Sequence, residues 1–174
     1  MAKRSSPTLP DRIVTALYRK DRKALDRYLT AETVNLRTAD DGRTLLMLAA
    51  SATNPDPELV KSLIDHGADV NLADLSGKYT ALHLAAASLH KDVAQVLLLA
   101  GADPNAEDAS GWTPLHHIVA ASDPRYLLIL ELTGHGADPD RKGNAWKTAR
   151  QAAADTGRQE LFRGVAGSGD APDS

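Results

Sequence analysis

The chain of 174 residues is 43% apolar, 25% charged and only 4% aromatic, and its formal net charge is −3. It contains no cysteine, which excludes disulfide bonds, thiolate metal sites and thiol nucleophiles. No apolar stretch approaches the roughly 20 residues that span a bilayer, and the N-terminus lacks the apolar core of a signal peptide, so we expect a soluble, cytoplasmic protein. Alanine and leucine are frequent and lead the helix propensity scale, so a mostly helical protein is expected.

The first expected element is a pair of short helices within residues 8–36. Pro10 and Asp11 open one helix and Asp21 opens the other, because proline suits the first turn of a helix and an aspartate can cap its N-terminus. The pair is basic, since the first 30 residues hold eight Lys or Arg against three Asp. Apart from two tyrosines it lacks the aromatic residues of a nucleic-acid surface, so a solvated capping surface is the preferred interpretation.

Beyond this pair, two markers recur with a common period. The first is a Gly-Ala-Asp segment whose glycines are 34 and 35 residues apart: Gly67, Gly101 and Gly136. The second is a threonine before a short helical segment, spaced by 36, 33 and 35 residues: Thr44, Thr80, Thr113 and Thr148. Because two independent markers share one period, the sequence predicts a repeat protein.

Each repeat predicts two helices and a turn. The threonine stands where its side-chain oxygen caps the first helix, and Pro114 follows at a first helical position, where its missing N–H does no harm. The second helix has apolar residues at i, i+3 and i+4, and the marker glycine ends it as a left-handed C-cap. Three more glycines precede the threonines in polar turns, where a positive φ costs glycine little: Gly42, Gly77 and Gly111.

The segment Thr113-Pro-Leu-His116 reproduces the signature of the ankyrin repeat family, and Thr80-Ala-Leu-His83 differs from it only at the proline. The chain therefore resembles this family, which implies an all-α solenoid of helix–turn–helix units joined by β-hairpin-like turns. The expected organisation is a flexible N-terminus (1–7), an ankyrin-repeat domain (8–165) and a disordered tail (166–174). The domain would comprise an N-terminal cap (8–36), three repeats (37–72, 73–106 and 107–140) and a C-terminal cap (141–165).

Some residues depart from the repeat pattern. Met47 replaces the motif histidine, and His117 occupies an inward-facing leucine position. Trp146 stands where a turn glycine is expected, so the last hairpin is predicted to be irregular. Two residues are added within 51–57 and two more within 120–128, which lengthens the turns between paired helices.

Histidines and aspartates are assigned structural roles. By the same resemblance, His83, His90 and His116 are expected to tie neighbouring repeats by hydrogen bonds, and no histidine cluster has metal-ligand spacing. Five recurring aspartates are expected to accept hydrogen bonds from hairpin amides: Asp69, Asp74, Asp103, Asp108 and Asp138. Nucleophile-elbow, phosphate-loop and zinc-protease motifs are absent. We therefore expect no enzyme activity, no cofactor and no metal site.

The hairpin tips and the exposed side of each first helix are expected, by this resemblance, to form one concave binding face. Trp112 and Tyr79 stand out, because an aromatic residue at a hairpin tip has little core to fill and aromatic residues dominate interface hot spots. The alternative for Trp112 is a ring lying flat on the neighbouring hairpin. The expected partner-binding residues are Asp40, Asp41, Arg43, Ser51, Leu75, Ser76, Lys78, Tyr79, Ser88, Ala109, Ser110, Trp112, Ala120, Asn144, Lys147 and Asp155.

The predicted function is protein binding through this face. The expected role is that of a bacterial inhibitor or immunity protein that neutralises a toxin or enzyme, and the alternative is a scaffold or regulatory adaptor. Residues 31–140 hold six Lys or Arg against sixteen Asp or Glu, so a basic partner is favoured. We expect no direct nucleic-acid or membrane partner, and a monomer when the protein is free.

Overall fold

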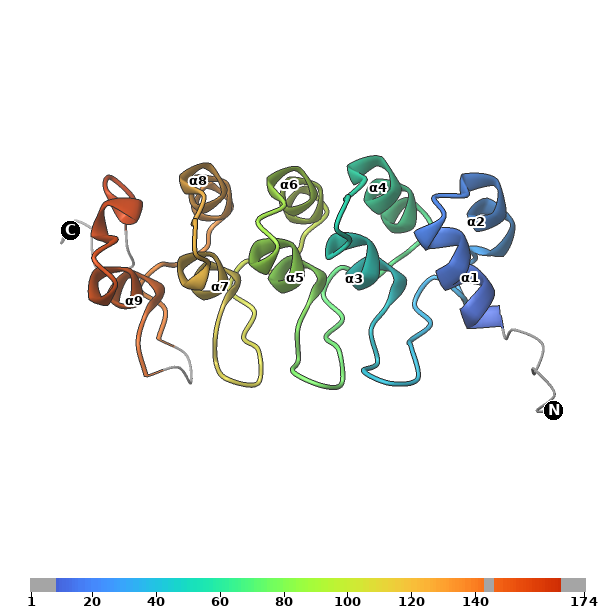
Figure 1. Ribbon diagram of the computed structural model, residues 1–174, viewed down its shortest axis with the longest axis horizontal. Helices are drawn as coiled ribbons and strands as arrows, with labels where there is room; N and C mark the ends of the chain where they lie inside the picture. Colours follow the sequence, from blue (N-terminus) through green and yellow to red (C-terminus); the bar gives the residue numbers. More distant parts are fainter. Residues whose placement is uncertain (1–8, 143–145, 167–174) are drawn as a thin grey trace, which may run out of the picture.

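The computed structural model describes residues 9–142 and 146–166, which form a row of helix pairs (Figure 1). Residues 1–7, the tail beyond Ala166 and Asn144 lie outside the described part. The helices are α1 (Leu9–Tyr18), α2 (Arg22–Tyr28), α3 (Leu45–Ala50), α4 (Pro57–Asp65), α5 (Ala81–Ala87), α6 (Lys91–Leu99), α7 (Pro114–Ala120), α8 (Tyr126–Gly134), α9 (Ala149–Asp155) and a 3-10 turn, η1 (Gln159–Phe162).

The predicted all-α solenoid is confirmed. In the described ranges there is no strand, only isolated bridges that join Arg37 to Thr44 and Ala73 to Thr80 at the bases of two hairpins. Helices α3, α5, α7 and α9 form one layer, α4, α6 and α8 lie on one side of it, and the hairpins extend from the other side (Figure 1). No helix in this part of the chain is both long and apolar enough to cross a membrane.

Each unit packs only on its neighbours in the row. First helices contact first helices, as α5 does with α3 and α7, and second helices contact second helices, as α6 does with α4 and α8. Their buried apolar side chains join into one core that runs the length of the stack. A unit with neighbours on both sides therefore buries its apolar surface, whereas a unit at an end needs a cap.

Local sequence fixes where each first helix begins. The hydroxyl of the marker threonine accepts a hydrogen bond from the amide three residues on in three repeats: Thr44, Thr80 and Thr148. The Thr113 hydroxyl bonds the ring of His116 at 2.9 Å, and Pro114 takes the first helical position as predicted. The added residues lengthen the inter-helix turns, because residues 51–56 separate α3 from α4 whereas only 88–90 separate α5 from α6.

Left-handed residues end the second helices and shape the hairpins. The predicted C-cap glycines have φ values of 91°, 87° and 89°: Gly67, Gly101 and Gly136. In the hairpins the left-handed residue stands two positions before the threonine: Gly42 (71°), Lys78 (57°) and Gly111 (76°). The expectation for Gly77 was wrong, because it stands three residues before Thr80 and Lys78 takes the left-handed position. Glycine at this position makes room instead, since a Cβ on Gly77 would lie 2.3 Å from Cε2 of Tyr79.

An asparagine at the same position of successive units connects each hairpin to the next. The side chain of Asn71 accepts a hydrogen bond from the amide of Asp103 at 2.8 Å and donates one to the carbonyl of Gly101 at 3.1 Å. Asn35 and Asn105 make the equivalent pair of bonds one repeat earlier and one repeat later. The asparagines therefore form a ladder that fixes the spacing of the units.

Replacing Asn71 by alanine is expected to lower the free energy of unfolding by about 1–2 kcal/mol, because two backbone groups lose their partner and recover only part of the loss by bonding water. Urea denaturation would measure the change. The matched control is Asn54→Ala, since Asn54 is exposed in the turn between α3 and α4 and forms no hydrogen bond with the described residues. Equal midpoints for both variants and the wild type would contradict a structural role for the ladder.

Candidate protein-binding face

One residue of each repeat stands immediately before the capping threonine: Arg43, Tyr79, Trp112 and Lys147. We call the surface formed by these residues, the hairpin tips and the exposed sides of α3, α5, α7 and α9 the hairpin face. Hydrogen bonds hold the backbone of the hairpin face in place at Tyr79 and at Trp112. Asp74 and Asp108 accept hydrogen bonds at 3.0 Å from the amides of Tyr79 and Trp112, respectively, and His83 Nε2 donates to the carbonyl of Trp112 at 3.1 Å. The backbone that carries both aromatic side chains is therefore fixed by hydrogen bonds.

Rings in contact occupy the centre of the hairpin face. The ring of Tyr79 meets that of His117 edge-on with centroids 5.6 Å apart, and His117 meets Trp112 at 5.4 Å. Trp112 also stacks on His116 of its own repeat, with ring centroids 6.0 Å apart. Trp112 is therefore half-buried, neither free at the tip nor flat on the neighbouring hairpin. Tyr79 Oη and Trp112 Nε1 form no hydrogen bond with the described residues, so both remain open to a partner.

His117 belongs to this face although it was not among the expected binding residues. Its Nε2 lies 2.9 Å from Oδ2 of Asp108, and its side chain is 15% exposed. The equivalent Leu48 and Leu84 are partly buried and pack against the core, so this position lies at the edge of the core. The signal available in the sequence was the change from leucine to histidine, since a polar ring suits a position at the edge of the core.

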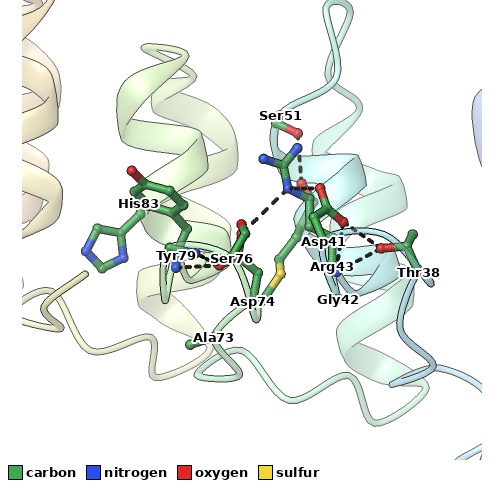
Figure 2. A network of polar contacts seen from close by, with 12 residues as sticks. Thr38, Asp41, Gly42, Arg43, Ser51, Ala73, Asp74, Ser76, Tyr79 and His83 are labelled. Atoms are coloured by element: carbon green, nitrogen blue, oxygen red, sulfur yellow. Dashed lines mark hydrogen bonds and ion pairs between the residues drawn. The ribbon is translucent and has the colours of Figure 1, made fainter. Parts of the chain in front are cut away.

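At the other end of the face, Arg43 lies between two carboxylates (Figure 2). Its Nε is 2.9 Å from Oδ2 of Asp41 and 3.7 Å from Oδ2 of Asp74. Asp41 also accepts the hydroxyl of Thr38 at 2.7 Å. Burial opposes ionisation of Asp74, yet hydrogen bonds from its own hairpin and the charge of Arg43 hold its pKa below the usual value. The Nη atoms of Arg43 have no partner among the described residues and point away from both carboxylates (Figure 2).

The hairpin tips lie side by side and are joined through their backbones. The amide of Leu75 donates to the carbonyl of Asp41 at 3.0 Å, and the amide of Ala109 donates to that of Gly77 at 2.8 Å. Most of the expected binding residues at the tips are exposed: Asp40, Leu75, Ser76, Lys78, Ala109 and Ser110. Hydrogen bonds from backbone amides, that of Asp41 above all, lower the pKa of Asp40. The structure therefore brings these residues together along one edge.

The remaining expected residues lie a helix length away from the tips. Ser51, Ser88 and Ala120 stand at the C-terminal ends of α3, α5 and α7. The Ser51 hydroxyl donates to a carbonyl of its own helix. Lys147 connects the start and the end of the first helix in its unit, because it stands just before the capping threonine and forms an ion pair with Asp155 at the end of α9.

Buried histidines tie the repeats as predicted. In His83 and His116, Nδ1 accepts the amide of the capping threonine and Nε2 donates to a carbonyl of the next repeat, that of Trp112 or of Lys147. A neutral ring with its proton on Nε2 satisfies both bonds. Burial lowers the pKa of His83 to about 4 and shifts the pKa of His116 in the same direction.

Other titratable groups are used in the same structural way. His90 donates to the carbonyl of Ala50 in the preceding repeat. The recurring aspartates accept hairpin amides as predicted, for example Asp69 from Asn71 at 2.9 Å. Within the ranges that the structure covers, no group of three or more His, Cys, Asp or Glu is placed to hold a metal ion.

The match to a family model agrees with this architecture. A model described as ankyrin repeats, in three copies, matches residues 13–108, which is more than half of the chain. The matched range runs from α1 to the hairpin before α7 and so includes the supports of Tyr79. A search of curated proteins found no match to the chain.

Proposed function

The chain belongs to the ankyrin repeat family, whose repeats are protein–protein interaction modules, and on this premise we propose that it binds a partner protein through the hairpin face. The observation that carries the proposal is the contact between Tyr79, His117 and Trp112. These rings are half-buried and contact one another, so they lose little conformational freedom on binding. Their exposed surfaces, Tyr79 Oη and Trp112 Nε1 remain available for contacts with a partner. Rigid tyrosine and tryptophan side chains are favoured at the centres of interfaces for this reason.

Charge contributes less to this proposal than the sequence alone suggested. Of the acidic residues along the face, Asp41 pairs with Arg43, Asp155 with Lys147 and Glu107 with Arg141. Carboxylates that already have a cation nearby attract a basic partner only weakly. We therefore propose that the aromatic contact determines the dissociation rate and that charge modestly speeds association.

The finer role remains the one expected from the sequence, inhibition of a partner toxin or enzyme. It differs from a scaffold in one measurable respect. An inhibitor reduces the activity of the protein it captures in proportion to occupancy, whereas a scaffold leaves that activity unchanged. An activity assay on the captured partner, with and without this protein, distinguishes the two roles.

We expect Trp112→Ala to weaken partner binding by more than about 1 kcal/mol, roughly a fivefold rise in Kd, mainly through faster dissociation. The measurement is surface plasmon resonance against the partner recovered on the immobilised protein from a native lysate. Thermal unfolding of the variant would be recorded in parallel, because Trp112 also contacts His116.

Tyr18→Ala is the matched control, since Tyr18 is an exposed aromatic residue on α1 that is not one of the expected partner-binding residues. It should leave the Kd unchanged. If Trp112→Ala and a reversal of Asp40 and Asp41 to lysine both leave binding intact while the fold is preserved, the partner sits on another surface.

A further inference from the structure

A small hollow opens between the N-terminal helix pair and the first repeat, and we call it the cap hollow. Its volume is about 20 Å³, roughly the space that one methyl group or one water molecule needs. Most of its lining side chains are apolar and come from α1, the first hairpin and α3: Ile13, Val14, Leu36, Leu45 and Leu48. Val14, Leu36 and Leu48 are only partly buried, so their apolar surface is accessible to another molecule.

The cap hollow belongs to the hairpin face. Leu48 stands four residues after its capping threonine, at the position that His117 occupies in a later repeat. Arg43 also lines the hollow, and it begins the row that Tyr79 and Trp112 continue. The hollow and the rings therefore lie along one surface, and a partner that covers this surface meets both.

The polar side chains that line the cap hollow leave only hydrogen-bond donors unused. The hydroxyl of Thr38 donates to Asp41 at 2.7 Å and accepts the amide of Arg43 at 2.9 Å. Nη1 of Arg37 donates to one carbonyl of its own hairpin at 2.6 Å and to one of the next hairpin at 2.8 Å. Nε and Nη2 of Arg37 and both Nη atoms of Arg43 have no partner among the described residues. A ligand at this site must therefore supply an acceptor.

Arg43 is held in one orientation by carboxylates on one side of its guanidinium group. Its Nε lies 2.9 Å from Asp41 and 3.7 Å from Asp74, whose side chain is fully buried. Asp74 is itself fixed, because it accepts the amides of Gly77 and Tyr79 at 3.0 Å. The Nη atoms point away from both carboxylates (Figure 2). A guanidinium group that is already oriented loses little freedom when it donates to a ligand.

These contacts define the chemistry of the ligand. The apolar walls suit an apolar group, because a water molecule needs two to four polar partners. The positive charges of Arg37 and Arg43 are matched by the negative charges of Asp41 and Asp74, so the acceptor need not be an anion. One residue of a polypeptide supplies both parts, a small apolar side chain and a neutral main-chain carbonyl beside it.

We propose that the partner inserts a small apolar side chain, that of valine or alanine, into the cap hollow, and that a main-chain carbonyl beside it accepts a hydrogen bond from Arg43. The occupant is an internal segment of the partner whose carbonyl is not already bonded within a helix. This inference rests on the proposed function, because it assigns the part of the partner that meets one end of the hairpin face. It adds a second anchor to the contact with the rings.

N-acetyl-valinamide is a minimal probe of this site, since it combines the side chain with neutral carbonyls. In NMR titrations of the full chain we expect saturable shifts of the Val14 and Leu48 methyl signals and of the Arg43 Nε–H signal, with a Kd in the millimolar range. N-acetyl-glycinamide lacks the side chain and should produce no saturable shift. Absence of saturable shifts with the valine probe, or equal shifts with the glycine probe, overturns the proposal.

Two further observations test the identity of the occupant. N-acetyl-valine, with a carboxylate in place of the terminal amide, should bind no more than about threefold more tightly than the amide. A larger preference would indicate the C-terminal carboxylate of a partner and contradict an internal segment. Nuclear Overhauser effects between residues 1–8 and the Val14 methyl groups in the free chain would show that the protein fills the hollow itself, which also overturns the proposal.

Val14→Ile adds one methyl group to the wall of the cap hollow. It should raise the Kd of the valine probe about fivefold or more, while the midpoint of thermal unfolding stays the same or rises, because filling a cavity improves packing. The matched control is Val96→Ile, since Val96 is a partly buried valine of the second helix α6, and it should leave the Kd unchanged. Leu48→Phe closes the hollow from α3 and serves as a second variant. Unchanged probe binding in both hollow variants would contradict the site.

The same variants separate this inference from the proposed function. Val14→Ile should also raise the Kd of the partner that is used for the Trp112→Ala measurement, and Arg43→Lys should do so because lysine keeps the charge but loses the planar fork. If Trp112→Ala weakens partner binding and these two variants do not, the inference fails and the proposed function stands. If the probe binds but none of the three variants changes partner binding, the partner does not use the hairpin face, and both proposals fail.

Discussion

Removal of residues 1–36 is expected to convert the protein into an aggregating chain. Helix α1 packs against α3, and Ile13 and Leu17 of α1 are buried in the common core. Arg22 of α2 also holds the N-cap carboxylate of α4, at 3.1 Å from Asp56. Without these helices the apolar side of the α3–α4 unit would face water, and a solenoid unit that loses its neighbour exposes a contiguous apolar surface.

Light scattering and size-exclusion chromatography of the truncated chain would measure the effect. A subtler version keeps the full length and compares Ile13→Asp with Tyr18→Asp, since Ile13 is 1% exposed and Tyr18 is 65% exposed on the same helix. Burying an unpaired carboxylate costs several kcal/mol, so only the first variant should unfold or aggregate. A truncated chain that remains monomeric and unfolds cooperatively would show that residues 1–36 are not a cap.

Acidification is expected to destabilise the protein between pH 6.5 and 4. Burial lowers the pKa of His83 to about 4 from an ordinary value of 6.5. Over this interval the unfolded chain binds a proton that the folded chain does not, so the free energy of unfolding falls as the pH falls. The loss from His83 alone is roughly 3 kcal/mol, and His116, whose pKa is also lowered by burial, adds to it. Protonation of His83 Nδ1 would place its N–H opposite the backbone N–H of the capping threonine, where two donors face each other.

Urea denaturation at a series of pH values would measure this dependence. The chain itself supplies the variant, because the position of His83 in its repeat is occupied by Gln151 in the last unit, where the side-chain oxygen accepts the Thr148 amide at 3.1 Å. The double variant His83→Gln, His116→Gln keeps an acceptor for the threonine amide but cannot titrate. It should be less stable at neutral pH and show a smaller loss towards pH 4. A slope equal to that of the wild type would mean that other groups cause the acid sensitivity.

The helix boundaries and hairpin supports were largely predictable because short-range interactions set them. A threonine hydroxyl reaches an amide three residues away, a glycine adopts a left-handed conformation at a helix end, and an aspartate accepts amides of its own turn. Thr80, Gly101 and Asp74 therefore take the roles that their sequence neighbours imply. The resemblance to the family was reliable for the same reason, because its motif consists of these local devices.

The composition of the hairpin face was less predictable, because it depends on residues that meet across repeats. His117 approaches Tyr79 of the preceding repeat, and a spacing of 38 residues in the sequence does not reveal that their rings are 5.6 Å apart. The charges of the hairpin face were similarly overestimated, because only the fold shows that Arg43 stands beside both Asp41 and Asp74.

By itself the sequence determined that the chain is a solenoid of capped helix pairs, because period, caps and turns are encoded within each repeat. Tertiary structure alone decided which side chains remain open to a partner. Trp112 rests on the ring of His116, Lys78 replaces Gly77 as the left-handed residue, and the leucines of α8 stay exposed where the last unit has only a short turn. Exposure is a property of neighbouring units, and the packing of those units is fixed only when the whole stack has formed.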